Sequence, residues 1–265
     1  MSSNSPVVPL ELEREIFEEA AINLLLVSHR VYEWTVTPRG ELSTCTFAAL
    51  RRAIQSNSKA PSFFRAHVHH LYIAPRPPAG DGSEVQEILS ACAGIQSLSF
   101  IWANIPPSIL PALSTLRPRR LWGYFDSLLA AKDLCQPMFT FVTHLLLFVP
   151  RTDIAASLSF LANFPSLTHL AIFGAEHSLA SHILASFKRL KVLVKHSSAS
   201  AGEELDNVDD RYVTISLQNP IEQWVMGSRG GNDVWARAEA FIAKKRQRKI
   251  QPDWRYWIKD ADGMS

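Results

Sequence analysis

The sequence predicts an α/β fold in which a short N-terminal helical module precedes an irregular solenoid with a parallel sheet, followed by a C-terminal helix. Three observations favour this architecture: a repeated short apolar segment, helical segments between the repeats, and an amphipathic stretch near the end of the chain. Hydrophobic residues make up 47% of the 265 residues and charged residues 20%. These values are typical of a folded chain that buries a sizeable core.

Five short apolar segments share one pattern, and a weaker sixth follows them. They are VHHLYIA (68–74), IQSLSFI (95–101), PRRLWGY (118–124), VTHLLLF (142–148), LTHLAIF (167–173) and LKVLVKH (190–196). Aligned on one leucine, they give positions 23 to 27 residues apart: Leu71, Leu98, Leu121, Leu145, Leu170 and Leu193. Because periods of about 20–29 residues are typical of leucine-rich repeats, the segments predict a leucine-rich-repeat-like solenoid.

The segments between the repeats have helical character. SEVQEILSACAG (83–94) is typical, with Ser83 as the expected N-cap and Gly94 as the expected C-cap. Alternating strands and helices at this spacing predict parallel strands joined by right-handed crossovers. An ordinary doubly wound α/β domain is the alternative.

Residues on one face of the predicted sheet form an apolar and aromatic surface. If the aligned leucines point into the core, their neighbours point to the opposite face. Solenoids usually bind partners on such a surface, which predicts a partner-binding face at Trp122, Tyr124, Leu146, Phe148 and Phe173. Alternatively, the C-terminal segment covers this face with its own aromatic residues, Trp224, Trp235, Trp254 and Trp257.

Motifs that carry chemistry are absent from the sequence. There is no nucleophile elbow, phosphate-binding loop, zinc-binding helix or dinucleotide fingerprint. The column His70, His144 and His169 has no carboxylate or cysteine to complete a metal site. We therefore expect no enzyme activity, no catalytic residues, no cofactor and no metal.

A basic run, KKRQRK (244–249), ends a predicted helix, NDVWARAEAFIAKKRQRK (232–249). Positive charge at a helix C-terminus complements the helix dipole, and a nuclear-localisation or nucleic-acid patch is the alternative. A net charge of +2 gives no reason to expect a nucleic-acid partner.

The sequence predicts a soluble protein of a reducing compartment, cytoplasmic or nuclear. Cys45, Cys92 and Cys135 lie far apart without a CxxC pair. The start of the chain lacks the features of a signal peptide. The most apolar run, FVTHLLLFVP (141–150), has about half of the ~20 residues that a membrane helix needs, so no membrane partner is expected.

The N-terminal stretch resembles an F-box. VPLELEREIF (8–17) is similar to the opening of that motif, and LLLVSHRVYEW (24–34) is similar to its later helix. Together with the degenerate repeats and the closing stretch NPIEQWVMGSRGGNDVWARAEAFI (219–242), the chain resembles F-box-like proteins of mushroom-forming fungi.

The resemblance implies a non-catalytic substrate receptor of a cullin–RING ubiquitin ligase, with a ligase adaptor subunit and an unidentified protein substrate as partners. It assigns adaptor docking to Leu12, Ile16, Phe17, Leu24, Leu25 and Val27. The predicted domains are a shortened F-box-like module (1–45), the solenoid (46–217) and a C-terminal helical cap and tail (218–265). Because only EEAAIN (18–23) separates the two halves of the motif, the alternative is a repeat-type binding module without ligase docking, whose N-terminal helices cap the solenoid.

Overall fold

The computed structural model describes residues 44–56, 59–73, 82–100, 105–124, 132–148, 154–173, 177–196, 208–216, 219–228, 230–259 and 262–263. The chain divides into two compact units, Met1–Phe64 and Arg65–Ser265. The predicted adaptor-docking residues all lie outside the described residues, and so does nearly all of the predicted module at 1–45.

In the first unit the described residues form α2 (Thr44–Gln55) and the first turn of α3 (Pro61–His67). Pro61 opens α3, where its missing N–H is not needed by the helix. Phe63 and Phe64 meet edge to face, and Phe64 is buried. Neither helix was predicted from the sequence.

The second unit contains seven parallel strands in the described residues, hydrogen-bonded in chain order. They are β1 (His70–Ile73), β2 (Ser97–Phe100), β3 (Arg120–Tyr124), β4 (His144–Phe148), β5 (His169–Phe173), β6 (Val192–His196) and β7 (Tyr212–Ile215). The α/β class and the parallel sheet are therefore confirmed, in a solenoid-like arrangement. The predicted alignment is also the register of the sheet, because Leu71, Leu98, Leu121, Leu145, Leu170 and Leu193 pair in sequence across β1 to β6.

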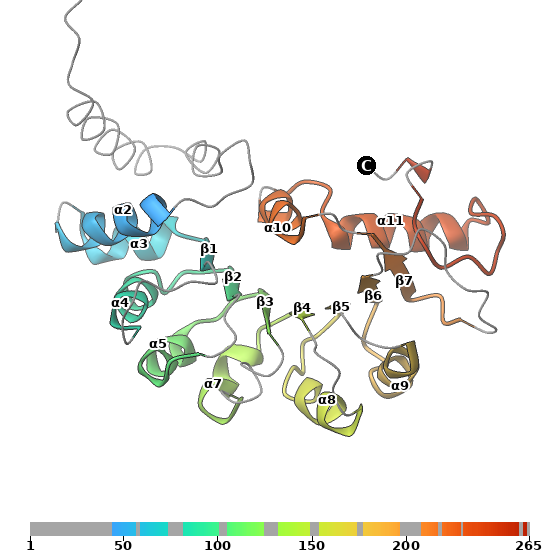
Figure 1. Cartoon of the computed structure of the whole chain (residues 1–265), viewed down its shortest axis with the longest axis horizontal. Coiled ribbons are helices and arrows are strands. Elements are labelled where there is room, and N and C mark those ends of the chain that lie inside the picture. Colours follow the sequence, from blue (N-terminus) through green and yellow to red (C-terminus); the bar gives the residue numbers. More distant parts are fainter. Residues whose placement is uncertain are drawn as a thin grey trace, which may run out of the picture. The chain divides into compact units, whose positions relative to one another are not determined.

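Helices between the strands cover one face of this sheet (Figure 1). They are α4 (Ser83–Ala91), the short 3-10 helix η2 (Pro107–Ile109) with α5 (Leu110–Thr115), α7 (Lys132–Phe139), α8 (Ile154–Leu161) and α9 (His177–Ser186). Leu98, Leu121, Leu145 and Leu170 are fully buried. Removing these side chains from water is the main source of stability in such a layered core.

The ends of α4 differ from the prediction. The helix begins at Ser83, with Gly82 at the N-cap in the left-handed region (φ 86°) and no side-chain cap, and its C-cap is Cys92. Gly94 has another role, because a Cβ on this residue would lie 1.9 Å from the carbonyl oxygen of Arg65. The glycine is required for close approach of two backbone segments, not for ending the helix.

Two C-terminal helices, α10 (Pro220–Ser228) and α11 (Val234–Arg246), lie on the face opposite the crossover helices (Figure 1). The predicted C-terminal helix is thus present, and the apolar residues along one side of it are buried: Val234, Trp235, Ala238, Phe241 and Ile242. None of the helices in the described ranges combines the length and the apolar character that a membrane span requires.

α11 runs across the strands from β3 towards β7. Its N-cap residue, Asp233, binds Arg120 at the start of β3, and Lys245 near its end binds Asp210 just before β7 at 3.3 Å. The 13 residues of α11 give a length of about 20 Å at ~1.5 Å per residue. Four strand spacings of ~4.8 Å give about 19 Å, so one straight helix matches the distance from β3 to β7.

The chain after α11 pairs with the last strand. The N–H of Thr214 in β7 donates to the carbonyl of Tyr256, and the N–H of Ile258 donates to the carbonyl of Thr214. Arg255 forms a bidentate ion pair with Asp262. The tail therefore satisfies backbone groups of the edge strand that are otherwise open to another chain.

Candidate interaction surface

The predicted partner-binding residues lie on one face of the sheet, in two rows across the strands. Trp122 and Leu146 are partners in one row, and Tyr124, Phe148 and Phe173 are successive partners in the other. The sequence alignment therefore placed all five residues on a common face. Accessibility divides them into two groups.

Three of these residues are not exposed, contrary to the expectation of an open face. The exposed fractions are 2% for Trp122, 0% for Leu146 and 8% for Phe173. The alternative named above agrees with this burial, since α10 and α11 lie over the same face and contact His70, His144 and His169. Trp224 and Trp235 are the buried aromatic residues that do so, whereas Trp254 remains 40% exposed. Partner binding by the face itself stays a prediction.

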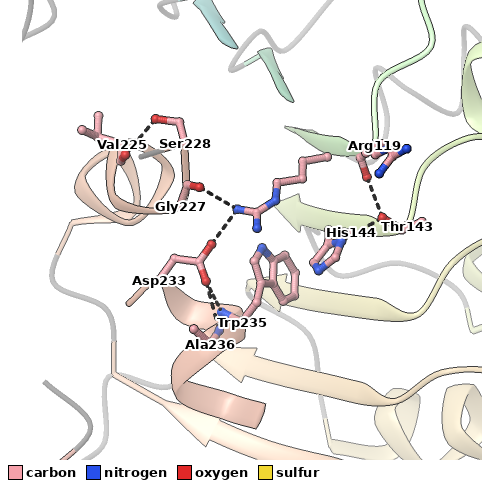
Figure 2. Close-up of polar contacts among 10 residues, drawn as sticks. Arg119, Thr143, His144, Val225, Gly227, Ser228, Asp233, Trp235 and Ala236 are labelled. Carbon is pink, nitrogen blue, oxygen red and sulfur yellow. Dashed lines mark hydrogen bonds and ion pairs between the residues drawn. The ribbon is translucent and has the colours of Figure 1, made fainter. Parts of the chain in front are cut away.

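An ion pair fastens the start of α11 to the sheet (Figure 2). Arg120 Nη1 lies 2.8 Å from Asp233 Oδ2 and donates to the carbonyl of Gly227 at 3.1 Å. The other carboxylate oxygen of Asp233 accepts from the backbone N–H groups of Trp235 and Ala236 at 3.1 and 3.0 Å. One carboxylate thus caps α11 and binds β3 at the same time.

Gly227 is necessary for this geometry. A Cβ on this residue would lie 2.2 Å from Asp233 Oδ2 and 2.6 Å from Arg120 Nη1. Both distances are far below van der Waals contact, so any side chain here displaces the ion pair. The absence of a side chain at Gly227, in the last turn of α10, therefore allows the Arg120–Asp233 ion pair to form.

Next to the ion pair, two histidines stack under α11. The rings of His144 and His169 are parallel to within 3°, with centroids 4.1 Å apart. The Trp235 ring meets both in edge-to-face contacts with centroid distances of 5.5 and 6.1 Å. Glu239 Oε1, one helical turn further along α11, lies 2.9 Å from His169 Nε2. The histidine column considered as a metal site is thus part of a helix–sheet contact.

Burial favours the neutral form of both rings. It is the largest cause that lowers the pKa of His144 from 6.5 to about 3, and the neighbouring His169, Arg120 and Lys191 lower it further. Burial also lowers the pKa of His169, although the hydrogen bond and the charge of Glu239 act in the opposite direction. Both imidazoles are therefore neutral at pH 7.

α10 covers the other end of the sheet. The Trp224 ring contacts His70 and Tyr72 of β1, with centroid distances of 6.4 and 5.6 Å. Burial, together with a smaller effect of Tyr124, raises the pKa of Tyr72 to about 12. The contact covers part of the first strand of this face, where His70 and Tyr72 remain partly exposed.

A row of four rings remains at the carboxyl ends of the strands, and we call it the aromatic ladder: Tyr124, Phe148, Phe173 and His196. Successive centroid distances are 5.4, 5.1 and 4.5 Å, and Phe173 and His196 are stacked. Tyr124, Phe148 and His196 are partly exposed. Ligands of open parallel sheets bind outside the carboxyl ends of the strands, which makes the ladder the candidate interaction surface.

Sequence reasoning missed two parts of this arrangement. His196 was not included in the ladder, although it lies three residues after Leu193, as Tyr124 lies after Leu121. The role of Asp233 was also missed, although Asp immediately before an apolar helical stripe is an N-cap signal.

The basic run also has a structural role. Lys245 pairs with Asp210, and Lys244 Nζ donates to the carbonyl of Asp262. Arg246, Arg248 and Lys249 are exposed. The first two lysines therefore hold the tail and the segment before β7 against α11.

Within the described ranges no group of three or more His, Cys, Asp or Glu side chains could hold a metal ion. The thiol of Cys92 is buried, and burial raises its pKa to about 12, so it is not a reactive nucleophile. No family model, no curated protein and no solved structure matches the chain.

Proposed function

We propose that this chain is a non-catalytic protein–protein interaction protein, an F-box-like substrate receptor of a cullin–RING ubiquitin ligase. The observation that carries the binding role is the aromatic ladder, whose Tyr124, Phe148 and His196 rings stay partly exposed. The N-terminal residues hold the ligase adaptor, and the ladder holds the substrate.

The ladder has the composition of a protein-binding hot spot. Aromatic side chains contribute a large apolar area at low conformational cost and are enriched where interfaces gain most of their energy. The Tyr124 hydroxyl and the His196 ring add hydrogen-bonding groups at the two ends of the row. The partner that suits this surface is a protein segment with apolar side chains and a few polar groups.

The adaptor part of the proposal rests on the sequence resemblance. Leu12, Ile16, Phe17, Leu24, Leu25 and Val27 provide the apolar positions of the motif.

A binding assay with the purified ligase adaptor subunit tests this part. The wild-type chain should bind the adaptor under conditions in which a standard F-box protein binds, and Ile16→Asp or Phe17→Asp should abolish binding. Circular dichroism must show unchanged helix content in both variants. No binding by the wild-type chain would contradict the ligase role and leave the repeat-type binding module.

The substrate part is tested by comparing proteins cross-linked in cells to the wild type and to three variants. Phe148→Ala and Tyr124→Ala should remove the same partner. Phe141→Ala is the matched control, because Phe141 is 49% exposed but precedes β4 instead of following it. A partner that binds all three variants equally would refute the ladder as its site.

A further inference from the structure

Two stacked histidines lie in the contact between α11 and the sheet. His144 and His169 are direct partners on β4 and β5, and their rings are stacked at 4.1 Å. Trp235, in the first turn of α11, rests with edge-to-face geometry on both. α11 is thus supported by a pair of rings that carries no charge when neutral and two positive charges when protonated.

Hydrogen bonds around the rings accommodate both states. Thr168 Oγ1 lies 2.8 Å from His169 Nδ1 and 3.1 Å from the carbonyl of Thr143. In the same way, Thr143 Oγ1 lies 2.9 Å from His144 Nδ1 and 3.2 Å from the carbonyl oxygen of Arg119. Each hydroxyl can donate a hydrogen bond to a neutral ring, or turn to donate to the carbonyl and accept a hydrogen bond from the N–H of a charged ring. Proton uptake therefore needs no broken hydrogen bond at these atoms.

The surrounding charges oppose a doubly protonated pair. Arg120 on β3 and Lys191 before β6 are positive, and α11 contributes the carboxylates of Asp233 and Glu239. Asp233 already binds Arg120 and caps the helix. Glu239 binds His169, so its negative charge can compensate the charge of one ring. The Glu239 side chain is 56% exposed, so solvent weakens this compensation.

The geometry points to a proton-sensitive latch, in which protonation of His144 and His169 releases α11 and exposes the sheet face around Trp122 and Leu146. Two like charges at stacking distance repel each other, and the Trp235 contact is lost when the rings separate. This regulation goes beyond the proposed function, because it concerns the covered face and not the aromatic ladder.

The size of the effect follows from the two states of His144. The pKa of His144 is lowered from 6.5 to about 3 while α11 covers it, and it returns to its ordinary value when the ring meets water. Proton linkage then shifts the opening equilibrium about 30-fold towards the open state between pH 8 and pH 5. His169 adds to the shift in the same direction.

Hydrogen exchange with mass spectrometry measures the opening directly, after correction for the intrinsic pH dependence of exchange. Protection of the α11 backbone in the full chain should fall by about 30-fold or more from pH 8 to pH 5, while α8 on the other face keeps its protection. If the protection of α11 fell by less than about threefold between pH 8 and pH 5, or if α8 and α11 lost protection equally, the latch would be overturned.

Three variants separate titration from packing. His144→Phe keeps a flat ring under Trp235 but cannot be protonated, so the pH effect should shrink at least tenfold; His144→Gln serves if the Phe variant does not fold. His144→Arg carries a permanent charge and should open α11 already at pH 8. His182→Gln on α9 is the control, since His182 is exposed, and it should change nothing. A pH effect of undiminished size in His144→Phe would contradict the proposal.

Discussion

The contribution of Asp233 to stability can be divided into two parts by two substitutions. Asp233→Asn removes the charge that pairs with Arg120 but keeps an oxygen to cap α11. The Asp233 side chain is 4% exposed and that of Arg120 is 31% exposed. Breaking a fully buried pair costs about 3–5 kcal/mol, and an exposed pair contributes ~0.2–1 kcal/mol. In Asp233→Asn, Arg120 remains in contact with solvent and with the Gly227 carbonyl. We therefore expect this substitution to lower the free energy of unfolding by about 1–2 kcal/mol.

Asp233→Ala removes the cap as well. The N–H groups of Trp235 and Ala236 then lose their acceptor at the buried start of the helix. Loss of an N-cap costs ~1 kcal/mol, which brings the expected total for Asp233→Ala to about 2–3 kcal/mol. Asp233→Ala should therefore lose more stability than Asp233→Asn, whatever the absolute size of the two losses.

Urea unfolding followed by circular dichroism gives the free energies of unfolding, with the slope of the transition as a check on two-state behaviour. A double-mutant cycle of Asp233→Asn with Arg120→Met isolates the pair, with an expected coupling of about 1 kcal/mol. Asp253→Asn is the control, because Asp253 is an exposed residue in the segment after α11. Its free energy of unfolding should stay within about 0.5 kcal/mol of that of the wild type. A coupling near zero, or equal losses for Asp233→Asn and Asp233→Ala, would refute the assignment of two separate roles.

Three further predictions concern the core, the turn after α4 and the dependence on pH. Trp122→Ala should cost about 3–5 kcal/mol in urea unfolding and Phe148→Ala clearly less, since Trp122 is buried and Phe148 partly exposed; equal losses would contradict these positions. Gly94→Ala should lower the thermal midpoint, because its Cβ meets the Arg65 carbonyl at 1.9 Å, and an unchanged midpoint would mean that this approach is not close. Since the pKa of His144 is lowered to about 3, its contribution is present above pH 6.5 and is lost as the pH falls. We expect about 2 kcal/mol less stability at pH 5 than at pH 8 in the wild type and a clearly smaller loss in His144→Phe, and a flat wild-type profile would exclude a lowered pKa.

The register of the sheet could be predicted because it repeats. Six leucines at similar spacing define which residues pair, and each strand then alternates between two faces. The placement of Tyr124 beside Phe148 and of Phe148 beside Phe173 followed from this alignment alone. Local periodicity contains the required information, since neighbouring strands are also neighbours along the chain.

The covering of the aromatic face could not be predicted in the same way. Arg120 and Asp233 are 113 residues apart, and no periodic signal connects them. Trp122 and Tyr124 are aromatic residues two positions apart on the same strand, yet the first is buried and the second is partly exposed. Composition identifies an apolar face but does not show whether the chain itself or a partner covers it.

The intramolecular cover also decides which surface is free to bind a partner. α11 belongs to the same chain as the sheet, so its effective concentration at the face is high, and an external helix has to compete with it. That competition includes the Arg120–Asp233 pair and the Trp235 contact, which α11 makes without any loss of translational freedom. The aromatic ladder lies beyond these contacts, so a partner at Phe148 has no need to displace α11. Binding at the ladder and release of α11 are therefore separable, and a partner that uses the ladder should bind equally well at pH 8 to wild type and to His144→Phe.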